Sequence, residues 1–102
     1  MEDLVRSGHV RNIGLSNVNC VKIVDVLKYC KIKPAVLQVE MHPFLPQENL
    51  LRFTQSLGIQ VMAYSNFGSL SYVELKMATE KDTCLLDGAV VGPAKKYGKS
   101  PA

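Results

Sequence analysis

Apolar and polar residues alternate in three rounds over the first part of the chain. Short apolar runs at 10–16, 35–41 and 59–64 predict strands, because β-branched and aliphatic residues favour extended structure. The stretches between them, at about 20–29 and 46–57, have apolar residues at helical spacing and predict helices. The strands begin about 24 residues apart, a spacing typical of βαβ units in a parallel sheet. The pattern therefore predicts an α/β fold with about three βα units.

The run 59–64 has the most apolar pattern of the three and ends in a polar turn. In a strand, successive side chains point to opposite faces of the sheet, and this run has apolar residues at both sets of positions. It therefore predicts a strand buried on both faces. The carboxyl ends of parallel strands meet at one edge of a sheet, where ligands bind in barrels and doubly wound folds. We therefore expect 16–17, 38–42 and 64–69 to gather at this edge.

The pattern weakens after residue 69. Residues 70–86 are expected to form a long loop with a helical turn near 72–77, and 89–97 to begin a helix that Gly92 and Pro93 disfavour. Both ends of the chain are expected to lie inside elements, with a helix end at 2–7 and a helix start at Ser100. Because two helices are too few to cover three parallel strands, we expect the chain alone to be poorly folded or aggregation-prone.

Composition narrows the class of protein. Apolar residues make up 47% and charged residues 21% of the chain, as in soluble globular proteins. The net charge of +3 comes from scattered basic residues, so we expect no nucleic-acid partner. No apolar run approaches the roughly 20 residues that cross a bilayer, and no signal peptide is recognisable. Three widely spaced cysteines predict free thiols, no metal site and a cytoplasmic location.

Three blocks of sequence carry a resemblance to a known family. The blocks 13–17 (Ile-Gly-Leu-Ser-Asn), 33–47 and 63–69 resemble the aldo-keto reductases in order, spacing and wording, with a looser match at 94–102. Their wording is most similar to that of the D-xylose (aldose) reductases. The resemblance implies that residues 1–102 are a partial domain, truncated at both ends, which covers strands five to seven of a (β/α)8 TIM barrel.

The resemblance also implies an activity. Members reduce an aldehyde or ketone to an alcohol by hydride transfer from NADPH, with NADH possible, and the full-length protein would be a monomer or homodimer acting on a small-molecule carbonyl substrate. The catalytic Asp, Tyr, Lys and His of the family match no position of this chain and are expected before Met1. The chain alone is therefore predicted to be inactive. The final strand, which distinguishes NADPH from NADH, is expected beyond Ala102.

The resemblance assigns cofactor-binding roles to nine residues. It implies hydrogen bonds to the nicotinamide carboxamide, stacking on the nicotinamide ring, a turn over the pyrophosphate and a contact with the adenosine ribose. The carboxamide contacts are assigned to Ser16, Asn17 and Gln38, and the stacking to Tyr64. The turn over the pyrophosphate is assigned to Ser65, Phe67, Gly68 and Ser69, and the ribose contact to Glu74.

Four of these assignments have a simpler structural alternative. Without the resemblance, Ser16 and Asn17 would be a helix N-cap, Gln38 a hydrogen-bonded core amide and Tyr64 a core aromatic residue. His42 matches a turn after a strand and is interpreted as structural. At the level of the whole chain, a non-catalytic aldo-keto-reductase-like binding or regulatory protein and a truncated, non-functional gene product remain the alternatives.

Overall fold

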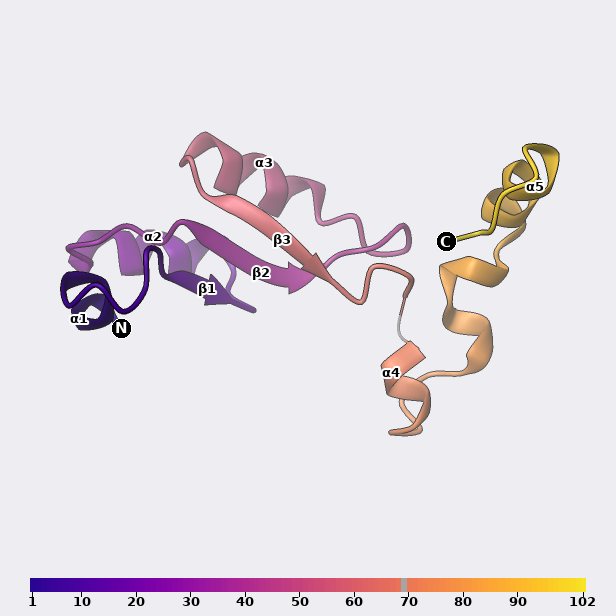
Figure 1. Cartoon of the computed structure of the whole chain (residues 1–102), viewed down its shortest axis with the longest axis horizontal. Coiled ribbons are helices and arrows are strands. Elements are labelled where there is room, and N and C mark those ends of the chain that lie inside the picture. Colours follow the sequence, from indigo (N-terminus) through magenta and orange to yellow (C-terminus); the bar gives the residue numbers. More distant parts are fainter. Residues whose placement is uncertain (69) are drawn as a thin grey trace. The chain divides into compact units, whose positions relative to one another are not determined.

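The computed structural model describes residues 1–68 and 70–102, without the side chains of residues 70 and 71. In chain order the elements are α1 (Glu2–Arg6), β1 (Gly14–Ser16), α2 (Cys20–Tyr29), β2 (Val36–Glu40), α3 (Glu48–Ser56), β3 (Gln60–Tyr64), α4 (Leu70–Val73), the 3-10 turns η1 (Glu80–Asp82) and η2 (Cys84–Leu86), and α5 (Gly88–Lys96) (Figure 1). The chain divides into two compact units. Unit 1 contains 1–39 and 47–63, and unit 2 contains 40–46 and 64–102.

The predicted parallel sheet is confirmed, with strand order β1-β2-β3 (Figure 1). Ser16 lies opposite Gln38 in the register of β1 and β2. The first strand is shorter than expected and begins only at Gly14. The reason lies in α1, because the N–H groups of His9 and Val10 both donate to the carbonyl of Leu4 and keep this segment out of the sheet.

The hydrophobic core of unit 1 lies between the sheet and the helices α2 and α3. Ile23 of α2, Leu37 and Val39 of β2, and Ile59 just before β3 are buried there. Asn19 caps α2 by accepting a hydrogen bond from the N–H of Lys22 at 3.0 Å. The two helices thus cover one face of the sheet.

The prediction that β3 is buried on both faces is wrong. Ile59 is buried, but Gln60 and Met62 are exposed, and the Met62 side chain is 49% accessible. Met62 lies on the face of the sheet opposite the core, and no element of unit 1 covers it. The apolar residues on this face of β3 led to the prediction of a second buried face, which unit 1 leaves exposed.

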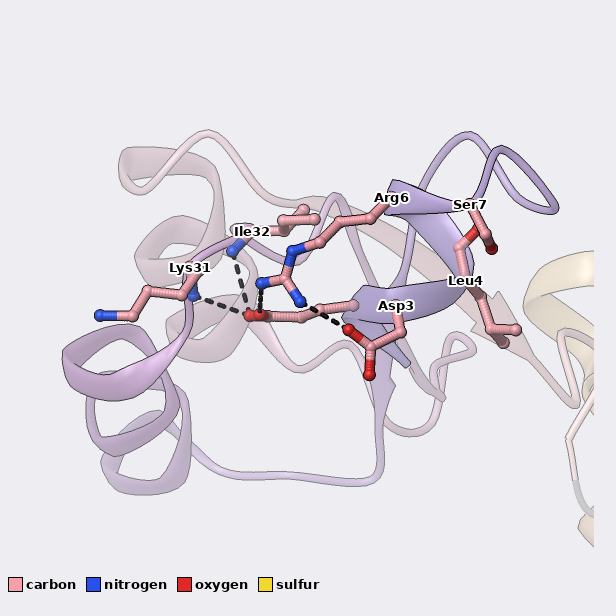
Figure 2. Close-up of polar contacts among 7 residues, drawn as sticks. Asp3, Leu4, Arg6, Ser7, Lys31 and Ile32 are labelled. Atoms are coloured by element: carbon pink, nitrogen blue, oxygen red, sulfur yellow. Dashed lines mark hydrogen bonds and ion pairs between the residues drawn. The ribbon is translucent and has the colours of Figure 1, made fainter.

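Glu2 attaches α1 to the turn after α2. Its carboxylate accepts hydrogen bonds from the backbone N–H groups of Lys31 at 2.7 Å and Ile32 at 3.0 Å, and it forms an ion pair with Arg6 at 2.8 Å (Figure 2). The N–H groups of Ile32 and Lys31 are the main reason that the pKa of Glu2 lies below its ordinary value. A single carboxylate therefore satisfies two backbone donors that lie 29 and 30 residues further along the chain.

Unit 2 has more regular structure than the sequence predicts. The expected loop 70–86 contains α4 and two 3-10 turns, and α5 runs through Pro93. The Asp87 side chain caps α5 by accepting from the N–H of Ala89 at 2.8 Å, and the Pro93 carbonyl accepts from Tyr97. The expectation that Gly92 and Pro93 disfavour this helix is wrong, and no helix begins at Ser100.

Candidate functional site

The sequence-predicted residues fall into two groups, one in each compact unit. Ser16, Asn17 and Gln38 lie in unit 1, where all three are exposed. Ser16 and Gln38 are paired across β1 and β2, and the N–H of Asn17 donates to the Gln38 carbonyl at 3.0 Å. Asn17 has a positive φ of 53°, a conformation that Asn tolerates better than most residues, and it turns the chain at the end of β1. The backbone thus brings three polar side chains together.

The structural alternatives for this group do not hold. Asn19, rather than Ser16 or Asn17, caps α2. Gln38 is exposed instead of being a core amide, and its Nε2 lies 3.1 Å from the Sδ atom of Met62. An open hollow on this face is lined by residues of all three strands, including Ser16, Gln38 and Met62. Two polar groups and one thioether are therefore available to a ligand lying on the sheet.

The second group forms a tight turn at the end of β3. Tyr64 is half-buried, and Ser65 follows it with a positive φ of 52°. The N–H of Gly68 donates to the Ser65 carbonyl at 2.8 Å. The Phe67 carbonyl accepts from the N–H of Cys84 at 2.8 Å and from the Thr83 hydroxyl at 2.9 Å. The turn is therefore held against the segment that contains Thr83 and Cys84.

Gly68 is required by this packing. Its φ is +91°, and a Cβ atom there would lie 2.6 Å from the carbonyl oxygen of Asp82. The close approach at Gly68 is thus made by the chain itself, and its N–H is already used within the turn. Phe67 is about half exposed, and Glu74 is exposed in the turn after α4. Ser69 lies outside the described residues.

The structure also shows a polar cluster in unit 2 that was not predicted from the sequence. Glu40 Oε1 lies 3.2 Å from Nε2 of His42, and Glu40 Oε2 accepts from the Tyr72 hydroxyl at 3.4 Å. The negative charge of Glu40, and secondarily Tyr64, raises the pKa of Tyr72 above its ordinary value. The spacing of Glu40 and His42 at a strand end was a usable signal. No sequence signal pointed to Tyr72, because 32 residues separate it from Glu40 in the chain.

A metal site and a membrane-spanning helix are both absent from the part of the chain that the structure describes. Within residues 1–68 and 70–102, no three His, Cys, Asp or Glu side chains form a group that could hold a metal ion. None of the described helices has the length and apolar character needed to span a bilayer.

Comparison with known proteins identifies the family. The model of the aldo/keto reductase family matches residues 1–91. The chain belongs to the aldo/keto reductase family. It is 50% identical to 4-dihydromethyl-trisporate dehydrogenase of Mucor mucedo over 89% of the chain and 28% of that protein. It is 46% identical to the NAD(P)H-dependent D-xylose reductase of Scheffersomyces stipitis over the whole chain and 33% of that protein.

Solved structures give the same result for the fold. The aldose reductase of Giardia lamblia matches 99% of the chain with a TM-score of 0.86 at 39% identity, and 31% of that structure is covered. The aldose reductase of Schistosoma japonicum matches with a TM-score of 0.77 at 37% identity. The three-stranded sheet is therefore part of a (β/α)8 barrel, as predicted. The chain spans about a third of the length of the relatives that it matches.

Proposed function

We propose that this aldo/keto reductase chain forms the nicotinamide- and pyrophosphate-binding side of an NAD(P)H-dependent carbonyl reductase. The observation that carries the proposal is the exposed set of Ser16 and Asn17, at the carboxyl end of β1, and Gln38, which pairs with Ser16 from the adjacent parallel strand β2. Ligands of α/β barrels bind at this end of the strands. The relatives include an NAD(P)H-dependent D-xylose reductase, which supports a nicotinamide cofactor.

The residue chemistry of the first group fits a carboxamide. This ligand group has one carbonyl acceptor and an amine with two donors, and Ser, Asn and Gln side chains supply both kinds of partner. The Gln38 amide donates to the Met62 sulfur, a weak acceptor, so a ligand carbonyl would be a better partner for it. These side chains would bind the nicotinamide and fix its orientation.

The second group would hold the rest of the cofactor. The Tyr64 ring, at the end of β3, would stack on the nicotinamide and leave the opposite ring face to the substrate. Ser65, Phe67, Gly68 and Ser69 would form the turn at the pyrophosphate, and Glu74 would reach the adenosine ribose. Because the N–H of Gly68 is used within the turn, we assign the donor role to the other residues of this turn and to the Ser hydroxyls.

The reaction follows from the cofactor and the family. A bound NADPH, or NADH, supplies a hydride to the carbonyl carbon of an aldose-type aldehyde or ketone, which becomes an alcohol. This chain would bind and orient the nicotinamide. The proton for the carbonyl oxygen would come from the family's Tyr, supported by Lys, Asp and His, none of which matches a residue of this chain. We therefore expect a cytoplasmic reductase activity that needs more than these 102 residues.

The test places this chain inside a complete barrel. In a chimera, the 102 residues replace the matching segment of the Scheffersomyces stipitis D-xylose reductase, which aligns over the whole chain. Gln38→Ala should raise the KM for NADPH about tenfold, because a hydrogen bond to the carboxamide is lost. Gln60→Ala, an exposed Gln on β3, is the matched control and should leave this KM unchanged. Equal KM values for both variants would contradict the assignment of Gln38.

A further inference from the structure

The cluster of Glu40, His42 and Tyr72 connects the ends of β2 and β3 through side chains in unit 2. Each oxygen of the Glu40 carboxylate has its own partner, His42 Nε2 at 3.2 Å and the Tyr72 hydroxyl at 3.4 Å. The His42 side chain is only 7% exposed and that of Glu40 20%. Glu40 is therefore held in place from one side by a buried ring and offers its second oxygen to Tyr72.

His42 is itself fixed by its surroundings. Its ring meets the Phe44 ring edge-on, with centroids 6.3 Å apart and an interplanar angle of 89°. Among the described residues, its buried Nδ1 atom has no hydrogen-bond partner. A proton on that buried nitrogen would be left unpaired, so the favoured tautomer carries the proton on Nε2 and donates it to Glu40.

Tyr64 interacts through both its backbone and its side chain. Its backbone carbonyl accepts a hydrogen bond from the N–H of Met41 at 3.2 Å. The Tyr72 hydroxyl, which meets Glu40, also interacts electrostatically with the Tyr64 side chain. Rotation of the Tyr64 ring about its side-chain torsions would change this interaction.

We propose that Glu40 and Tyr72 are positioning residues that fix the orientation of the Tyr64 ring and hold α4 to the end of β2. The proposal rests on the proposed function, in which Tyr64 stacks on the nicotinamide. Tyr72 lies on α4, which follows the turn 65–68 in the chain, so its bond to Glu40 also restrains that turn. Removal of the Glu40 carboxylate or the Tyr72 hydroxyl should make the Tyr64 ring and the turn after β3 more mobile. Every side chain that would contact the cofactor is still present in these variants.

The first measurement needs no cofactor. In the chimera with the Scheffersomyces stipitis D-xylose reductase, labelled with ¹³C-tyrosine, NMR follows the titration of the phenols of this segment in the unsubstituted parent and in Glu40→Gln, Tyr72→Phe and Tyr97→Phe. We expect Tyr72 to titrate above its ordinary range, Glu40→Gln to lower that midpoint, and Tyr72→Phe to shift the Tyr64 resonances. Tyr97 is 69% exposed and directly follows α5, 25 residues after Tyr72 in the sequence, so Tyr97→Phe is the matched control and should change neither. A Tyr72 that titrates as in a free peptide, or unshifted Tyr64 resonances, would overturn the proposal.

The second measurement adds NADPH to the chimera with the Scheffersomyces stipitis D-xylose reductase, as the unsubstituted parent and with each of four substitutions. We expect Tyr72→Phe and Glu40→Ala to weaken NADPH binding several-fold, Glu40→Gln to retain most of it because its amide oxygen still accepts from Tyr72, and Tyr97→Phe to bind as the parent does. If the resonance changes are seen but no protein binds NADPH, the proposed function fails and the network stands. If NADPH binds equally to all of them, the positioning role fails and the proposed function stands.

Discussion

Gly68 illustrates how one neighbouring backbone group determines the residue at a position. Its φ of +91° and the Asp82 carbonyl, 2.6 Å from where a Cβ atom would lie, both require glycine. The sequence predicts a glycine turn here. It does not indicate that the tight neighbour is the chain itself, because Asp82 lies beyond a stretch with no periodic pattern.

Gly68→Ala should therefore destabilise unit 2. The cost of a non-glycine residue in this conformation is about 1–3 kcal/mol, to which the contact with Asp82 adds. Denaturant unfolding and faster hydrogen exchange of the Cys84 amide, which donates to Phe67, would measure it. Gly92→Ala is the control, because a Cβ there meets nothing within 4 Å and a helical Gly-to-Ala change stabilises by up to about 1 kcal/mol. Equal stability of both variants would contradict this explanation of Gly68.

Site residues could be predicted from the sequence where a local pattern determines their position, and could not where a distant contact does. The strands β1, β2 and β3 could be located from the sequence, and with them Ser16, Gln38 and Tyr64. The link from Tyr72 to Glu40 could not, because no local pattern reports a contact across 32 residues. From the sequence, Asn17 could be a helix N-cap or a nicotinamide contact, and the N-cap interpretation is wrong because Asn19 caps α2.

Elements were predicted best where their own periodicity is strong. The helix Cys20–Tyr29 was predicted with both ends correct, since ten residues of amphipathic pattern follow a capping Asn. The first strand was predicted too long, because the bonds from His9 and Val10 to Leu4 are a consequence of α1 docking. Pro93 misled the prediction of α5, since the Asp87 cap and the Pro93 carbonyl sustain that helix.

The docking of α1 should depend on pH through Glu2. Its pKa is lowered in the folded chain by the N–H groups of Ile32 and Lys31. A lowered folded pKa stabilises the fold above the unfolded value of 4.5, and this stabilisation is lost as the pH falls through the folded pKa. Glu2→Gln should speed hydrogen exchange of the Lys31 and Ile32 amides at neutral pH and remove the acid-dependent step.

Asp3→Asn is the matched control for this experiment. Asp3 pairs with Arg6 at 2.6 Å, but its side chain is 90% exposed and the structure shows no bond from it to the turn after α2. Exchange at Lys31 and Ile32 should therefore be unchanged in this variant. If Asp3→Asn and Glu2→Gln accelerate exchange equally, the docking role assigned to Glu2 is wrong.

At the scale of the whole chain, the small hydrophobic core of unit 1 stabilises the sheet. Leu37 has no exposed surface, and Leu37→Ala should cost about 2–5 kcal/mol, as other buried Leu-to-Ala changes do. That is a large share of the stability of any small domain. Leu86→Ala, at a 65% exposed position, should change the unfolding free energy by less than about 0.5 kcal/mol. Thermal or urea unfolding of the two variants compares them directly, and similar losses would place the core elsewhere.

The fold class and the family could be predicted from the chain, because three sequence blocks and a regular strand spacing are global signals. Burial could not, since it depends on what covers each face. Met62 looked like a core residue and is 49% exposed, on the same face as Ser16 and Gln38. In a barrel this chain supplies only some of the strands, which agrees with its covering about a third of each relative.

The central claim is that this chain carries the cofactor side of a reductase without its catalytic residues. The most direct test measures NADPH oxidation in the presence of D-xylose, in parallel for the 102-residue chain and for the chimera with the Scheffersomyces stipitis D-xylose reductase. We predict sustained oxidation by the chimera and none by the chain alone. Oxidation by the isolated chain, or a folded chimera that neither binds nor oxidises NADPH, would contradict the claim.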